Sequence, residues 1–507
     1  MAESRTKNTK RNIASGFVYR VLSMILPFIV RTAVLYIMGA SYTGLTSLFT
    51  SILHVLNLAE LGFSSAIVYN MYKPIADGDT DTVSALLNYY RKIYFVIGTF
   101  ILIVGCGLMP WLPKLINGDY PQDVNIYLLY FLYLLNTVFS YWLFAYKSTL
   151  ITAVQRVDLQ NKVYSVTLIL YNIAHLAVIV FTQNVYLYAI VSICTTVVNN
   201  LSVEYLSRKY FPQYLCKGKP EAATRKKIKK QVAGIMVEKL GDASRNSFDS
   251  IIISSVLGLI SVTIYSNYYY IFSSIYALLL TITNAMTASV GNSVSKESVK
   301  KNYDDLRRFQ FIFCGIICAC CTCLLCLYQP FMKIWTGEDL MLPFFEMSLF
   351  CVYFFILNCN NMGQIYFSTN GLWWKAKVYT LIEAFGNLLL NIVLGKFFGI
   401  AGVLMATILT IFFLQFIPRT NVTFSEYFKM KPMKYYISTI LYGVASVVSC
   451  IVAYQICVRI PLEGIPCIAV RLIVCVVVAP LTYMTLFAKT EVEKDSIKYL
   501  KAAIKRK

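Results

Sequence analysis

Charged residues are scarce in this 507-residue sequence, at 14% of the total, whereas a soluble domain has roughly 25%. Long polar stretches are also lacking, since no gap between hydrophobic segments exceeds about 25 residues. With 58% hydrophobic residues, the composition excludes an ordinary cytosolic protein and leaves no room for an attached soluble catalytic domain. The nucleotide-binding motif G-x-x-x-x-G-K-[ST] is absent, which excludes ATP hydrolysis by that route. We therefore expect a membrane protein that is not an enzyme.

Histidine is nearly absent, and His54 and His175 each lie alone in an apolar run, which favours packing over catalysis. The 15 cysteines lie almost wholly in apolar segments, six of them from Cys314 to Cys326, without a neighbouring histidine or carboxylate. We interpret them as small apolar residues and expect neither a metal nor a cofactor.

A run of alternating acidic residues, D-G-D-T-D at 77–81, resembles part of a calcium loop but lacks the bidentate glutamate that such a loop needs. We interpret the run as a helix start, with Thr80 or Asp81 as the N-cap of the segment 82–92.

Basic residues are distributed unevenly: 37 of the 46 lysines and arginines lie in every second gap between hydrophobic segments. Gaps rich in lysine and arginine stay in the cytoplasm, so this pattern fixes the orientation and places both termini there. The net charge of +21 is therefore explained by topology and anionic lipid rather than by nucleic acid.

Fourteen segments are long enough to cross the hydrocarbon core, which takes about 20 residues each. They lie at 13–38, 43–70, 93–112, 125–146, 163–182, 185–206, 233–257, 262–289, 310–331, 342–366, 378–395, 399–418, 434–457 and 467–487.

A weak internal repeat relates the two halves of the chain. The letters KVY at 162–164 recur at 377–379, and further identities recur at similar offsets. Six spans in each half make this a parallel repeat, and such transporters bind substrate between the halves. We predict four parts: a first lobe at 1–215, a basic linker at 216–232, a second lobe at 233–425, and two extra helices with a basic tail at 426–507.

Four basic residues lie inside predicted spans, where a charge costs about 2.5–3.5 kcal/mol and therefore usually faces a cavity. Arg20 and Arg31 share one face of the first span. Lys239 lies at the position equivalent to Arg20 in the second half, and Arg245 follows it. These cations predict a hydrated lumen that binds anions, and arginine suits bidentate contact with phosphate.

Acidic residues also lie within the spans. We expect them either to pair with the cations or to couple transport to H⁺ or Na⁺, and structural ion pairs between neighbouring spans are the alternative. They are Glu60, Glu238, Asp242, Asp249 and Glu383.

The segment 41–66, SYTGLTSLFTSILHVLNLAELGFSSA, resembles the opening of bacterial polysaccharide-biosynthesis membrane proteins, the Wzx-type flippases. In that family a Y-x-G turn is followed by an acidic-x-Gly motif, which Tyr42, Gly44, Glu60 and Gly62 carry here. The similarity covers roughly the first 100 residues best, and the whole chain in span number and repeat.

The resemblance implies the multidrug/oligosaccharidyl-lipid/polysaccharide (MOP) exporter fold, all-α and V-shaped with two six-helix lobes. It implies a flippase that moves a polyprenyl-diphosphate-linked oligosaccharide from the cytoplasmic to the outer leaflet of a bacterial inner membrane, for capsule, O-antigen or exopolysaccharide synthesis. Membrane lipid and polysaccharide-assembly membrane proteins are the implied partners. The neutral groups that could contact the sugar, or simply pack, are Tyr268, Tyr269, Tyr270, Asn172, Asn284 and Asn387.

Three other functions fit parts of the pattern. A cation-coupled drug or small-molecule antiporter of the same superfamily would share the two lobes, but not the extra pair of spans or the cationic lumen. A polysaccharide polymerase or ligase would need a longer outward loop than 113–124. A scaffold that transports nothing is also consistent with the sequence.

Overall fold

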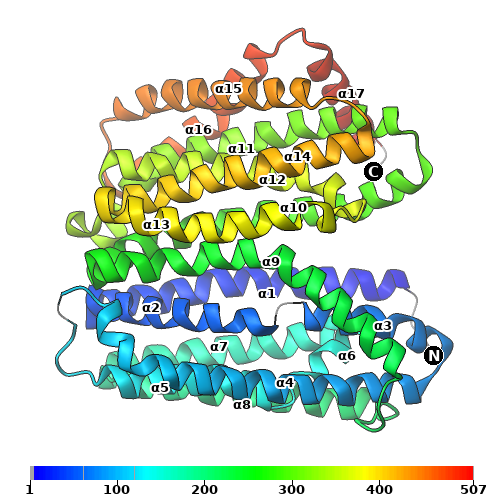
Figure 1. Cartoon of the computed structure of the whole chain (residues 1–507). Coiled ribbons are helices and arrows are strands. Elements are labelled where there is room, and N and C mark those ends of the chain that lie inside the picture. The colour runs from blue at the N-terminus through cyan, green and yellow to red at the C-terminus, as the bar shows by residue number, and fades with distance from the viewer. Residues whose placement is uncertain (1–4, 61, 119, 506–507) are drawn as a thin grey trace. The chain divides into compact units, whose positions relative to one another are not determined.

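The structure is a computed structural model that describes residues 5–60, 62–118 and 120–505, and every regular element in these ranges is helical (Figure 1). The α-helices are α1 Arg5–Ala33, α2 Ala40–Leu56, α3 Phe63–Asp77, α4 Thr80–Leu108, α5 Ile126–Trp142, α6 Lys147–Ala153, α7 Val157–Thr182, α8 Val185–Tyr210, α9 Ala222–Leu257, α10 Leu259–Lys296, α11 Val299–Thr336, α12 Phe344–Thr369, α13 Trp373–Thr410, α14 Ile417–Thr423, α15 Met433–Val458, α16 Gly464–Leu486 and α17 Glu491–Lys505. Short 3₁₀ and π segments join them: η1 Val34–Met38, η2 Asn57–Glu60, η3 Met109–Leu115, η4 Glu338–Leu340, η5 Ile411–Phe416 and η6 Phe424–Phe428.

All fourteen predicted spans fall on these helices. Within the described residues, ten helices are long and apolar enough to cross a membrane, and α5 with α6, bent by 51°, adds an eleventh when counted as one span. The prediction of an all-α, multi-pass membrane protein is therefore confirmed.

The chain divides into two compact units, 1–263 and 264–507, and the division falls near the start of α10. Helix α9, which was predicted to open the second lobe, packs on α2 and α3 in unit 1. The predicted linker at 216–232 was placed from the sequence repeat, whereas the division at 263 comes from how the helices pack. The four predicted parts therefore stay a prediction.

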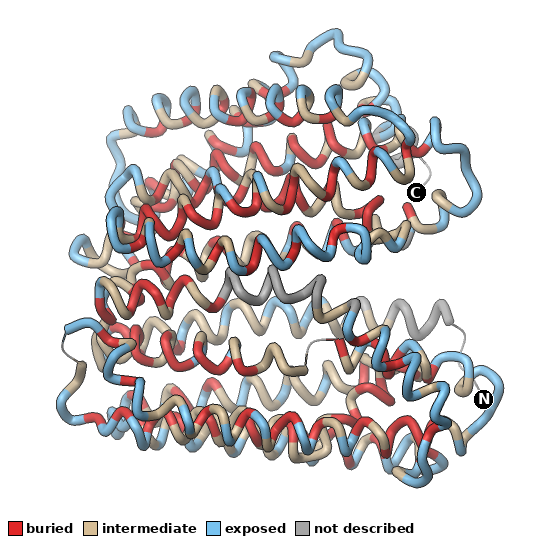
Figure 2. Tube along the Cα trace, viewed as in Figure 1, coloured by how far each residue is buried: buried red, intermediate tan, exposed pale blue. Residues whose placement is uncertain are grey.

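In unit 1, α4, α5 and α8 lie side by side, and α7 packs between α8 and α1 (Figure 1). Buried residues line the faces where these helices meet (Figure 2). Phe49 and Tyr130, both fully buried, meet edge to face with ring centroids 5.4 Å apart. The outer faces carry exposed apolar side chains such as Phe181 and Leu170, as expected for helices that face lipid.

In unit 2, α11 is the central helix, and it packs against α12, α15 and α16. Helix α13 bends at Gly399. The backbone conformation there (φ 60°, ψ −137°) is one that residues other than glycine rarely adopt. This bend lies at the junction of the predicted spans 378–395 and 399–418. The second arm continues through η5, α14 and η6 to Phe428, ten residues beyond the predicted end of its span.

The acidic run at 77–81 caps a helix, as expected, but with a different residue. Asp79, rather than Thr80 or Asp81, is the N-cap of α4, and its carboxylate accepts a hydrogen bond from the backbone N–H of Thr82 at 2.9 Å. The hydrogen bonds from Thr82 lower the pKa of Asp79 below its ordinary 3.8.

We predict that the first turn of α4 loosens in acid. A carboxyl whose pKa is lowered on folding stabilises the fold above its unfolded pKa, and this stabilisation is lost as the pH falls through the folded value. Hydrogen exchange of the Thr82 amide, relative to an amide in the middle of α4, should accelerate below the ordinary aspartate pKa of 3.8. Asp79→Asn is the matched control, because it keeps a capping oxygen that does not titrate; the same acceleration in that variant would contradict the assignment.

Candidate functional site

Two of the four motif residues explain how α2 is placed in unit 1. The Tyr42 hydroxyl donates to the Asp123 carboxylate, with O···O distances of 2.6 and 2.7 Å. At Gly44, α2 approaches the start of α10 so closely that a Cβ would lie 2.2 Å from the Leu259 carbonyl oxygen. The motif therefore needs glycine at this position because two backbones meet there.

Gly44→Ala should destabilise the protein by about 1–3 kcal/mol, since an overpacked site must shift its backbone. Gly107→Ala in α4 is the matched control, because a Cβ there would have no atom within 4 Å. Thermal unfolding of the two purified variants compares them directly. An equal midpoint for Gly44→Ala and the intact protein would contradict the close approach seen between these backbones.

The acidic motif residue, Glu60, lies in a tyrosine-lined site inside unit 1. The hydroxyls of Tyr90 and Tyr94 lie 3.2 and 3.4 Å from Glu60 Oε1. Tyr141 closes the group, because its ring packs 5.2 Å from that of Tyr94 and its hydroxyl donates to Asn57 Oδ1 at 3.1 Å.

The turn that presents Glu60 depends on the last motif residue, Gly62. Its φ of +91° is left-handed, and a Cβ would lie 2.9 Å from Ile235 Cβ on α9. Helix α3 begins directly after this glycine. The Glu60 site therefore joins α4, α5 and the η2 turn inside unit 1.

The predicted cations on α1 differ in their surroundings. Arg20 is exposed, and Arg31 is half-buried. On α9, Asp249 is buried at 2% exposure. The side chains of four other predicted residues of α9 lie outside the described part of the structure: Glu238, Lys239, Asp242 and Arg245.

Glu383 of α13 pairs with Arg419 of α14 inside unit 2. Their side chains are 0% and 5% exposed, and Arg419 Nη2 lies 4.0 Å from Glu383 Oε2. The guanidinium also donates to Thr380 Oγ1 at 3.3 Å and lies over the Phe367 ring, 5.7 Å from its centroid. The predicted span 399–418 ends one residue before Arg419, whereas the helical segment continues past it to Phe428.

A ladder of amides and hydroxyls joins the two arms of α13 across the bend at Gly399. Asn387 Nδ2 donates to Thr407 at 3.3 Å and to Thr410 at 3.2 Å, and Asn391 Nδ2 donates to Asn387 Oδ1 at 3.2 Å. All four residues are buried. The hydrogen bonds satisfy polar groups that would otherwise be costly in a membrane-spanning segment.

The other predicted sugar contacts are dispersed. Tyr268 is fully buried, and its hydroxyl donates to Gln329 Oε1 at 2.7 Å. Asn172 is 2% exposed and bonds to the carbonyl of its own helix one turn earlier. Tyr269 and Tyr270 are half-buried, whereas Asn284 is exposed. Their role in binding sugar stays a prediction.

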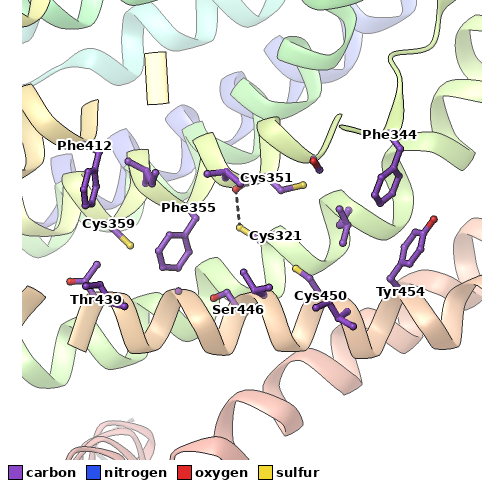
Figure 3. Close-up of a pocket in the computed structure, with 18 of the residues that line it drawn as sticks. Cys321, Phe344, Cys351, Phe355, Cys359, Phe412, Thr439, Ser446, Cys450 and Tyr454 are labelled. Atoms are coloured by element: carbon purple, nitrogen blue, oxygen red, sulfur yellow. Dashed lines mark hydrogen bonds between the residues drawn. The ribbon is translucent and has the colours of Figure 1, made fainter. Parts of the chain in front are cut away.

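Unit 2 also contains an apolar cavity of about 580 Å³ between α11, α12, η5 and α15 (Figure 3). Phe355 points from α12 towards α15, and Phe344 and Tyr454 lie together at one end. Two hydroxyls in the lining, those of Thr439 and Ser446, donate to carbonyls of α15 itself. The cavity therefore offers a ligand mostly hydrocarbon and sulfur surface.

No family model and no curated protein matches this sequence. Solved structures do match. The lipid II flippase MurJ, in an inward closed conformation, aligns with a TM-score of 0.67 and 14% identity over 94% of this chain and 98% of that chain.

Multidrug transporters match as well. An inward-facing MATE family transporter of the MOP superfamily aligns with a TM-score of 0.62 and 14% identity over 79% of this chain and 94% of that one. The MATE transporter VcmN of Vibrio cholerae aligns with a TM-score of 0.57 and 15% identity over 84% of this chain and 99% of that one. At such identities these matches establish the fold, so the prediction of a MOP transporter fold is confirmed.

Proposed function

We propose that this protein is a flippase that moves a polyprenyl-diphosphate-linked oligosaccharide across a bacterial inner membrane by alternating access. The extent of the MurJ match supports the proposal most directly. The match leaves 6% of this chain unaligned. Helices α15 and α16 have 26 and 23 of the 507 residues, about a tenth of the chain, so they cannot both lie wholly in the unaligned part. The likeness to a lipid flippase therefore includes at least part of the extra helical pair.

The cations on α1 and α9 supply the chemistry that a diphosphate requires. A diphosphate leaves the headgroup region only if positive groups replace its hydration, and guanidinium groups bind phosphate oxygens in pairs. Arg20 and Arg31, with Lys239 and Arg245 on α9, are the groups proposed for this role. The cytoplasmic orientation of both termini, inferred from the basic gaps, would give this site access to lipids of the inner leaflet.

The apolar cavity of unit 2, considered by itself, suits an isoprenoid chain. A polyprenyl chain gains free energy from hydrocarbon contact, and about 580 Å³ lined by Phe355, Phe412, Phe416 and neighbouring aliphatic residues supplies it. The hydroxyls of Thr439 and Ser446 already donate within α15, so most of the lining favours an apolar ligand.

Glu60 is the proposed coupling residue of unit 1, and Glu60→Gln tests it. Glutamine keeps an oxygen for the tyrosine hydroxyls but cannot bind or release a proton. We expect the variant to fold, to bind substrate and to lose the dependence of transport on the H⁺ or Na⁺ gradient. Transport in proteoliposomes with and without each gradient measures this. Unchanged gradient dependence in Glu60→Gln would exclude Glu60 as the coupling group.

A cation-coupled drug antiporter is the second candidate, and the MATE matches favour it. The two functions differ in the charge of the cargo. A site for cationic drugs needs exposed carboxylates, whereas a site for a lipid diphosphate needs exposed cations.

Competitive binding to the purified protein in nanodiscs separates the two. A fluorescent polyprenyl diphosphate should be displaced by its unlabelled oligosaccharide-linked form. Polyprenyl monophosphate should compete at least about tenfold more weakly, because it loses one or more charge-assisted hydrogen bonds. A cationic dye should not compete at all. Saturable binding of the dye without binding of the diphosphate lipid would replace the flippase with the antiporter.

A further inference from the structure

Three cysteines from three different helices meet inside unit 2. They are Cys326 of α11, Cys457 of α15 and Cys475 of α16, and all three are at most 1% exposed. Their sulfur atoms all lie within 4.8 Å of one another. The three helices pack against each other along their lengths, so the cluster is held by the core of the unit rather than by loops.

A fourth cysteine extends the cluster. Cys323 precedes Cys326 by three residues and so lies on the same face of α11. Its half-buried side chain packs against the buried cysteines of the cluster. The Cys475 thiol also reaches the Thr322 carbonyl oxygen at 3.7 Å.

A cation contacts the backbone of this cluster. Arg471 precedes Cys475 by one helical turn on α16, and its Nη1 lies 3.5 Å from the carbonyl oxygen of Cys326. Arg471 Nε is buried and has no hydrogen-bond partner among the described residues.

We propose that Cys326, Cys457 and Cys475 form a thiolate site for a d¹⁰ metal cation, Zn²⁺ or Cu⁺. Thiolates are the ligands that these ions prefer. Sulfur ligands at 2.3 Å from a tetrahedral zinc lie about 3.8 Å apart, so the three sulfurs of this cluster need a contraction of at most about 1 Å. Binding releases the thiol protons to solvent.

Charge balance gives Arg471 its part in this site. Zn²⁺ with three thiolates carries one negative charge, and Cu⁺ with two thiolates carries the same charge. The Arg471 guanidinium neutralises either complex, which matters in a membrane-spanning segment, where an uncompensated charge is costly. The ion would join α15 and α16 to α11.

Other cysteines of the chain lack this arrangement and provide the controls. Cys467 lies on α16 and is 4% exposed, but it is not part of the cluster. Cys314 and Cys359 form a buried pair with sulfur atoms 3.9 Å apart, without a third member. The cysteines of α11 alone gave no reason to expect a metal, whereas two of the three ligands come from α15 and α16.

The test uses the full chain, purified under reducing conditions, stripped with a chelator and loaded separately with Zn²⁺ and with Cu⁺. Elemental analysis should give one ion per chain for one of these metals. Cys457→Ser and Cys475→Ser should each lose it, while Cys467→Ser should keep it. Arg471→Gln should weaken metal affinity about 10–100-fold, as changes beside a metal site commonly do.

A second measurement on the unsubstituted protein removes any dependence on how the variants fold. X-ray absorption of the loaded protein should show a shell of three sulfurs at about 2.3 Å for zinc, or of two or three sulfurs for copper. The proposal would be overturned if neither metal binds stoichiometrically, if the shell contains only nitrogen or oxygen, or if Cys475→Ser retains the metal. A disulfide between two of the three cysteines after purification under reducing conditions would also overturn it.

Discussion

Arg419→Ala should destabilise the protein by about 3–5 kcal/mol, because it leaves the carboxylate of Glu383 buried without the guanidinium that faces it. Both side chains are almost completely buried, so water cannot replace the lost partner. The variant should unfold at a markedly lower temperature in detergent. It would also release Thr380 and the Phe367 ring from their contacts with the guanidinium.

The double variant Glu383→Gln/Arg419→Met separates the ion pair from other effects. Replacing both partners of a buried pair is often nearly neutral, so the double variant should recover most of the stability that the single variant loses. Lys301→Ala, which breaks an exposed pair with Glu297, should change stability by less than about 1 kcal/mol. A double variant less stable than Arg419→Ala would show that Arg419 does not act through Glu383.

Arg31→Ala should lower the rate of lipid translocation by about 10–100-fold, since a hydrogen bond to a charged group contributes about 1.5–3 kcal/mol. Arg20→Ala should have an effect of the same size if both guanidinium groups bind the diphosphate. Arg31→Lys should restore only part of the activity, because lysine keeps the charge but not the paired donors.

Lys114→Ala is the matched control for these variants, because it removes an exposed cation from η3, outside the proposed lumen. It should translocate lipid at the rate of the intact protein. Equal losses in Lys114→Ala and Arg31→Ala would show that general surface charge, rather than a diphosphate site, limits transport. The fraction of protein that folds and reconstitutes must be equal in all variants.

Much of the architecture could be predicted from the sequence because it depends on one-dimensional signals. Apolar length places helices, and the alternation of basic gaps fixes their orientation. The bend at Gly399 was predictable as a junction between two spans. The continuation of the helix to Phe428 was not predictable. A polar residue such as Arg419 suggests a loop, because its buried partner, Glu383, lies 36 positions earlier in the sequence.

The candidate sites were less predictable. Glu60 could be singled out as a carboxylate in an apolar span, but its tyrosine partners on α4 and α5 depend on packing. Asn387 was predicted to contact sugar, and its amide is found bridging the two arms of α13. The cysteine cluster is formed by residues of α11, α15 and α16. Cys326 and Cys475 lie too far apart in the sequence for any short motif to predict their contact.

The most direct test of the proposed function is leaflet translocation by the intact protein in proteoliposomes. A polyprenyl-diphosphate oligosaccharide, placed in both leaflets, is followed by its accessibility to an enzyme or quencher added outside. We expect rapid exchange between leaflets in vesicles with the protein, and loss of that exchange in Arg20→Ala and Lys239→Ala. No exchange beyond that of empty vesicles, or exchange that both substitutions leave unchanged, would contradict a flippase with a cationic lumen.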